Sequence, residues 1–168
     1  MIDWCIKKLT HIMFNFQERI FPTMIQDCYK ICMVAKAMID KKFVFVSHTV
    51  LGCLYLNMGL LEDARKVFDL LRDVAEEIQD WSQAMLAYEW IGRVLQASCD
   101  FDNAIKSFKK MMQLSWVNNI PEYEIKSFHN IAKQYFYLQY IEKSTFYQER
   151  FLRGMLENPL SCQRTIAE

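Results

Sequence analysis

The chain has 168 residues, 52% of them hydrophobic, and 20 Lys and Arg balance 20 Asp and Glu. A chain of this size and composition can bury a core of its own, so we expect a single domain that needs no disulfide or metal ion. The zero net charge and the absence of a run of like charges argue against nucleic acid or an anionic membrane as the partner.

Amphipathic periodicity predicts eight helices. They are expected at residues 3–18, 22–39, 43–58, 61–78, 81–97, 101–116, 121–138 and 141–156. Gly59 can end the third helix in a left-handed cap, Asp100 and Asp102 are N-cap candidates for the sixth, and Pro22 and Pro121 fit first helical turns. The short breaks between the helices indicate antiparallel pairs.

Three stretches of the chain align at a spacing of forty residues. They are Leu51-Gly52-x-x-Tyr55, Ile91-Gly92-x-x-Leu95 and Ile131-Ala132-x-x-Tyr135. The motifs Ala64-x-x-x-Phe68 and Ala104-x-x-x-Phe108 follow the two glycines at a constant offset. A fixed period of this length is typical of a solenoid of stacked helix pairs. The small residues at 52, 92 and 132 would allow the partner helix to approach closely.

This pattern resembles the tetratricopeptide repeat, in which a large, a small and an aromatic residue on one helix precede Ala and an aromatic residue on the next. The period is about six residues longer than the family's usual period of about 34, as in Pins-type adaptors and kinesin light chains. The resemblance implies an all-α, right-handed superhelical solenoid of four antiparallel helix pairs. Its repeats are expected at 5–44, 45–84, 85–124 and 125–156, with a tail at 157–168.

In arrays of this family the first helix of each pair lines a concave, peptide-binding face. The polar residues on those helices that packing does not need are therefore candidate partner-binding residues: Asn57, Glu89, Arg93, Gln96, Lys126, His129 and Lys133. The cations would bind a carboxylate or an acidic peptide, and the amides would pair with its backbone. Phe136 and Tyr137 fall on the same side and would anchor a partner if they are exposed.

Cysteine and motif content predict no metal site, no cofactor and no catalytic residue. The six cysteines match no zinc or disulfide spacing, and Cys28 and Cys32 are expected to be small apolar core residues. The chain has four glycines and lacks a phosphate-binding loop or a nucleophile motif. We therefore expect neither an enzyme nor a small-molecule substrate.

Two functional classes follow from these features. The first is a subunit of a larger cytoplasmic assembly, cytoskeletal or ciliary in kind, because the last helix pair still carries Ile141, Phe146, Phe151 and Leu152. The alternative is a transient adaptor that holds a short peptide or helix in its groove. Either way the partners are proteins, and we expect no membrane insertion because no segment reaches about 18 apolar residues. An RNA-reading repeat is disfavoured by the neutral charge.

Overall fold

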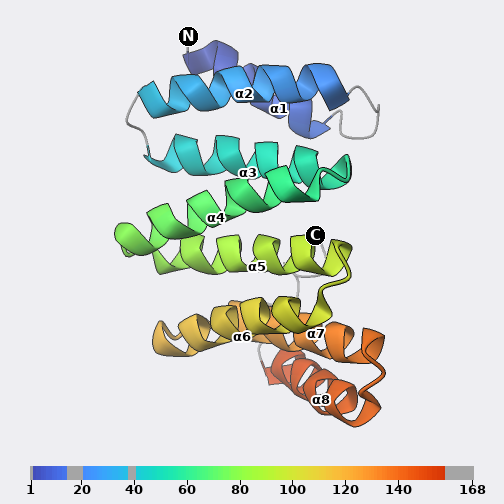
Figure 1. The fold of residues 1–168 in the computed structure, drawn as a ribbon. Coiled ribbons are helices and arrows are strands. Elements are labelled where there is room, and N and C mark those ends of the chain that lie inside the picture. Colours follow the sequence, from blue (N-terminus) through green and yellow to red (C-terminus); the bar gives the residue numbers. More distant parts are fainter. Residues whose placement is uncertain (1, 15–20, 38–40, 158–168) are drawn as a thin grey trace. The chain divides into compact units, whose positions relative to one another are not determined.

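The computed structural model describes residues 2–14, 21–37 and 41–157, which form eight helices and no strand (Figure 1). The helices are α1 (Ile2–Phe14), α2 (Phe21–Ala37), α3 (Lys41–Asn57), α4 (Leu61–Glu77), α5 (Trp81–Ala97), α6 (Phe101–Val117), α7 (Pro121–Tyr137) and α8 (Ile141–Glu157). The predicted all-α class is confirmed. The predicted helix ends at 18 and 39 and most of the predicted tail lie outside the described residues.

The helices follow a regular spacing along the chain. Each helix from α2 to α8 has 17 residues, and each helix from α3 to α8 begins 20 positions after the previous one. One helix pair therefore takes forty residues, which is the period seen in the sequence. Pro121 lies at the first position of α7, and the Asp100 side chain caps α6 by accepting a hydrogen bond from the Asn103 backbone N–H.

The turns after α3, α4, α5, α6 and α7 share one geometry. A residue with positive φ stands at the same place in each turn: Gly59, Gln79, Cys99, Asn119 and Gln139, with φ between 53° and 76°. The next residue donates a 2.9 Å backbone hydrogen bond to the carbonyl five positions earlier, as from Leu60 to Tyr55 and from Asp80 to Ala75. This is the Schellman arrangement, which satisfies the last carbonyls of a helix. Gly59 was predicted in this role, whereas the other four positions lack glycine.

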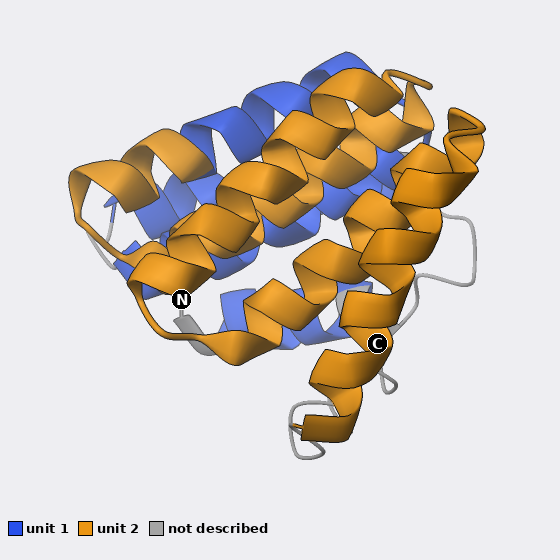
Figure 2. Ribbon diagram, turned by 90° about the horizontal axis from the view of Figure 1, so that it is seen from below, with its two compact units in different colours: residues 1–71 blue, residues 72–168 orange. Residues whose placement is uncertain are grey.

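The chain divides into two compact units, unit 1 (residues 1–71) and unit 2 (residues 72–168), coloured separately in Figure 2. The division falls inside α4 and so does not coincide with a predicted repeat boundary. Within each unit, helices that follow one another in the chain pack together, as in a solenoid. The repeat bounds and the right-handed superhelix of the whole chain stay predictions.

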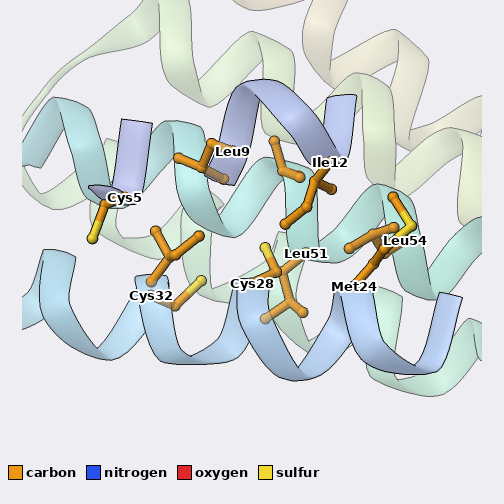
Figure 3. Packing of buried hydrophobic residues seen from close by; sticks show 10 residues of the cluster. Cys5, Leu9, Ile12, Met24, Cys28, Cys32, Leu51 and Leu54 are labelled. Atoms are coloured by element: carbon orange, nitrogen blue, oxygen red, sulfur yellow. The ribbon is translucent and has the colours of Figure 1, made fainter. Parts of the chain in front are cut away.

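Unit 1 has an apolar core built from its first three helices. Figure 3 shows side chains of α1, α2 and α3 pointing toward one another, and the buried members are Cys5, Leu9, Ile12, Met24, Cys28, Ile31, Cys32, Val50, Leu51 and Leu54. The first helix pair, α1 and α2, therefore contributes both of its helices to the core. Cys28 and Cys32 are buried, as expected for small apolar residues.

Two glycines make room for the rings of two phenylalanines. A Cβ added to Gly52 would lie 2.5 Å from Phe68 Cζ, and one added to Gly92 would lie 2.5 Å from Phe108. Both rings are fully buried. The small residues thus act as predicted, since each lets the second helix of its pair place an aromatic ring against the first. We call this contact the glycine–phenylalanine interlock.

The third copy has no such interlock. Ala132 takes the small position, and Ser144 Oγ donates a 2.9 Å hydrogen bond to its carbonyl oxygen. Gln148 stands where the phenylalanine would be, and α8 contains no buried residue. The helix pair that lacks the phenylalanine therefore also ends in a helix without a buried residue.

The shared turn geometry predicts the effect of glycine substitutions. A non-glycine residue in the left-handed conformation is strained by about 1–2 kcal/mol. Glycine removes this strain, but its greater freedom in the unfolded chain costs about 0.5–1 kcal/mol on folding. Gln79→Gly and Gln139→Gly should each raise the free energy of unfolding by about 0.5–1 kcal/mol in urea titration. Gln113→Gly, the same change in the exposed middle of α6, should lower it by about 1 kcal/mol. Equal effects at the three sites would contradict the turn assignment.

Candidate partner-binding groove

An open pocket of about 410 Å³ lies between α5 and α7 in unit 2. We call it the groove. Glu89, Arg93 and Gln96 line it from α5, and Lys126, His129, Asn130 and Lys133 line it from α7. The spacing of three or four residues within each set places its members on one helix face. Six of the nine predicted partner-binding residues therefore surround one pocket, and Asn130 joins them.

Arg93 is held in place from two sides. Its Nη2 atom donates a hydrogen bond to Glu89 Oε1, and its guanidinium carbon lies 4.6 Å from the centroid of the Trp90 ring. Glu89 is only 3% exposed, so its carboxylate faces Arg93 rather than solvent. A buried carboxylate needs such a partner, because an uncompensated charge in the interior is strongly destabilising. Glu89, predicted as a partner contact, thus acts on the groove by orienting Arg93.

A buried glutamine joins the two sides of the groove. Gln134 is fully buried on α7, and its Nε2 atom donates hydrogen bonds to Gln96 Oε1 at 2.8 Å and to the Asn130 carbonyl oxygen at 3.1 Å. Its own Oε1 atom has no hydrogen-bond partner among the described residues. Gln134 was not among the predicted partner-binding residues, although a glutamine between the apolar positions of α7 is a visible signal. The residue fixes the position of the Gln96 amide.

The groove carries more positive than negative charge. Arg93, Lys126 and Lys133 stand against the single carboxylate of Glu89. The ammonium of Lys126 lies 5.7 Å from the centroid of the Tyr123 ring, whereas Lys133 is exposed. The lining is thus electrostatically suited to an anionic ligand.

The surroundings of His129 favour its neutral form. Its ring packs against Phe151, with centroids 4.8 Å apart, while another part of the side chain stays open to solvent. This packing removes water from the imidazole and lowers its pKa below the usual 6.5, and the positive charge of Lys133 lowers the pKa further.

Three predicted residues lie outside the groove. Asn57 is in unit 1, where it is exposed and its Nδ2 atom donates a 2.8 Å hydrogen bond to the Cys53 carbonyl oxygen. Phe136 and Tyr137 are exposed at the end of α7, one turn beyond Lys133. The Tyr137 ring packs against Phe101, with a centroid distance of 5.2 Å. Both aromatic residues are exposed, which is the condition under which they were expected to anchor a partner.

Unit 1 contains a second group of interacting polar side chains. Hydrogen bonding from the Cys28 thiol lowers the pKa of Cys32, against the opposing effect of burial, and His48 and Ser47 lower it further. The His48 Nδ1 atom lies 2.8 Å from the Val44 carbonyl oxygen. Cys28, Cys32, Ser47 and His48 are all buried, so this group is part of the core. The described ranges contain no cluster of His, Cys, Asp or Glu that could hold a metal ion.

Comparisons with known proteins find relatives in structure only. No protein-family model matches the chain, and no curated protein matches it in sequence. The TPR domain of Arabidopsis FLU matches with a TM-score of 0.63 and 18% identity, over 67% of this chain and 95% of that domain. The apo form of RapI matches with a TM-score of 0.79 and 15% identity, over 92% of this chain. Aspartyl phosphate phosphatase F from Bacillus subtilis matches with a TM-score of 0.82 and 14% identity, over 94% of this chain.

The chain spans 57% of the RapI structure and 42% of the phosphatase F structure, so it corresponds to a part of each. The TM-scores support a common fold, and at identities this low the likeness extends to the fold alone. Together with the forty-residue spacing of the helix pairs, these likenesses show that the chain has the fold of tetratricopeptide repeats. None of the helices in the described part of the chain is long and apolar enough to cross a membrane.

The environment of His129 predicts its titration. By NMR, the imidazole should titrate below pH 6.5, and Lys133→Ala should raise this pKa only partly, because burial is the larger cause. The unfolded chain takes up this proton near pH 6.5, before the folded chain does. The contribution of His129 to stability is therefore complete above that pH and is lost as the pH falls through the folded pKa. A measured pKa at or above 6.5 would contradict the described packing.

Proposed function

We propose that the chain is a non-enzymatic protein-interaction scaffold whose groove holds an acidic segment of a partner protein. The observation that carries this proposal is the charge of the groove, where three cations surround an open, polar pocket that has one buried carboxylate. An acidic peptide would find its complement there through charge-assisted hydrogen bonds.

The roles of the cations differ. Arg93 is oriented before the partner arrives, because Glu89 and Trp90 already fix its guanidinium, so little side-chain entropy is lost on binding. Lys133 is an exposed, flexible ammonium that adjusts to the ligand. A single exposed ion pair contributes only about 0.2–1 kcal/mol. Useful affinity therefore needs two or three acidic side chains together, with the amides of Gln96 and Asn130 available to the peptide backbone.

Phe136 and Tyr137 supply the apolar part of the proposed contact. Phe136 is 60% exposed, and both rings lie one helical turn beyond Lys133. Exposed aromatic side chains beside a charged groove are common energetic anchors of protein interfaces. The partner segment we propose therefore carries acidic residues followed by an apolar side chain.

The groove's lining supports binding rather than catalysis. Its one imidazole, His129, has no serine, threonine or cysteine beside it among the seven lining residues, and the carboxylate of Glu89 is paired with Arg93. A nucleophile within reach of a base is what hydrolytic chemistry requires. We accordingly propose no substrate and no cofactor for this site.

The second candidate function is a lasting place in a larger assembly, and the exposed apolar side chains of α8 favour it. Groove binding and assembly through α8 are compatible, because they use different helix faces. A cytoplasmic location in a cytoskeletal or ciliary assembly stays a prediction from the sequence.

Charge reversal tests the groove. The double variant Lys126→Glu with Lys133→Glu should bind acidic peptides at least tenfold more weakly, a loss of about 1.4 kcal/mol, because two attractions become repulsions. Peptides would first be selected by the wild-type chain from a random displayed library, with enrichment of Asp and Glu expected, and then measured by fluorescence anisotropy. Arg93 is left unchanged, since its removal would strand the buried carboxylate of Glu89.

The matched control is Lys106→Glu with Lys110→Glu, which makes the same change in net charge on exposed positions of α6. It should change the affinity less than twofold. The affinity of the wild type should also fall as the salt concentration rises, because the Debye screening length shortens from about 10 Å at 0.1 M to about 3 Å at 1 M. Enrichment of basic or uncharged peptides, or equal losses in both variants, would exclude the acidic-ligand proposal.

A further inference from the structure

The last helix of unit 2 exposes apolar side chains on its outer face. We define the α8 face as Ile141, Thr145, Gln148, Leu152 and Leu156, whose spacing of three or four residues places them on one side of the helix. Leu152 is 52% exposed and Leu156 is 84% exposed. Three of the five residues, Ile141, Leu152 and Leu156, are apolar and exposed, which is a feature of interaction surfaces.

The repeat itself indicates what kind of element covers such a face. Forty residues earlier, the same positions on α6 are Phe101, Ile105, Phe108, Met112 and Trp116. The three central ones are buried in a cluster with Phe128 and Ile131 of α7. The corresponding face of α6 is therefore covered by an amphipathic helix that offers two apolar residues three positions apart.

We propose that the α8 face binds an amphipathic helix of a partner protein, seated on α8 as α7 is seated on α6. The partner would place two apolar side chains, at positions i and i+3, against Leu152 and its neighbours, as Phe128 and Ile131 are placed against Met112. This extends an interface that the chain already forms within itself. The surface lies on a different helix from the groove, so the proposal is independent of the acidic ligand.

A charge gives the partner helix a further property. On α6, the Lys109 ammonium lies 3.4 Å from the Tyr135 hydroxyl oxygen of α7, seven positions after Phe128. The residue of α8 equivalent to Lys109 is Glu149, which is exposed. The partner helix should therefore carry Lys or Arg at position i+7, where it would pair with the Glu149 carboxylate.

Polar residues in the middle of the α8 face suit a reversible contact. Thr145 and Gln148 stand where α6 has Ile105 and Phe108. These polar residues reduce the apolar surface that the α8 face exposes to solvent when no partner is bound. A second copy of this chain is a poorer occupant than another protein. The copy's own α7, which would have the matching residues, keeps Phe128 and Ile131 buried against α6.

A peptide with the sequence of α7 is a direct probe. It spans residues 121–137 and carries Tyr135→Lys, so that its lysine can meet Glu149. Its binding to the full chain, followed by fluorescence anisotropy, should weaken at least tenfold in Leu152→Asp. Leu152 is more than half exposed, so this variant should keep the fold, which circular dichroism would check. Val117→Asp, a change at an 83% exposed apolar residue at the end of α6, should leave binding unchanged.

A charge swap tests the predicted polarity of the helix. Glu149→Lys should weaken the lysine peptide at least threefold, and a peptide with Tyr135→Glu should recover that loss on the same variant. Three outcomes would overturn the proposal: no binding at millimolar peptide, binding that Leu152→Asp leaves intact, or self-association of the wild-type chain that Leu152→Asp abolishes. The last result would make a second copy the occupant.

Discussion

The packing of the helix pairs depends on two positions where glycine provides no Cβ atom. Because Gly52 and Gly92 have no Cβ, the rings of Phe68 and Phe108 fill space that any other residue would occupy, and each helix pair closes around one buried ring. Glycine inside a helix costs about 1 kcal/mol relative to alanine. Complete burial of a phenylalanine contributes about 1.5–3 kcal/mol, so the exchange favours the pair.

The interlock in unit 2 also sets the geometry of the groove. It fixes α6 against α5, and α6 in turn packs against α7 through Phe108 and its neighbours, so that α5 and α7 present their polar faces to one pocket. The hydrogen bond between Gln134 and Gln96 then joins the two helices at the groove. Where the interlock is lost, at Gln148, the helix keeps an exposed face. The same packing rule thus accounts for a polar groove and for the α8 face.

Much of the fold could be predicted from the sequence, because the residues that build it recur at a fixed spacing. Helix bounds came within about two residues for most helices, since amphipathic period and caps are local signals. The left-handed conformation of Gln79, Cys99 and Gln139 was not foreseen, because glycine is the usual mark of such turns. Gln134 and the buried state of Glu89 were missed because they depend on contacts between helices. The lining residues themselves followed from the family resemblance, which implies a concave face lined by the first helix of each pair.

A double-mutant cycle on Gly92 and Phe108 tests the interlock most directly. Gly92→Ala alone should lower the free energy of unfolding, because overpacking costs about 1–3 kcal/mol, against a gain of about 1 kcal/mol in helix propensity. In the Phe108→Leu background the smaller side chain leaves room for the added methyl group, so the same alanine should be neutral or stabilising. The account predicts a coupling free energy of about 1 kcal/mol or more between the two sites. Additive effects, with no coupling, would contradict it.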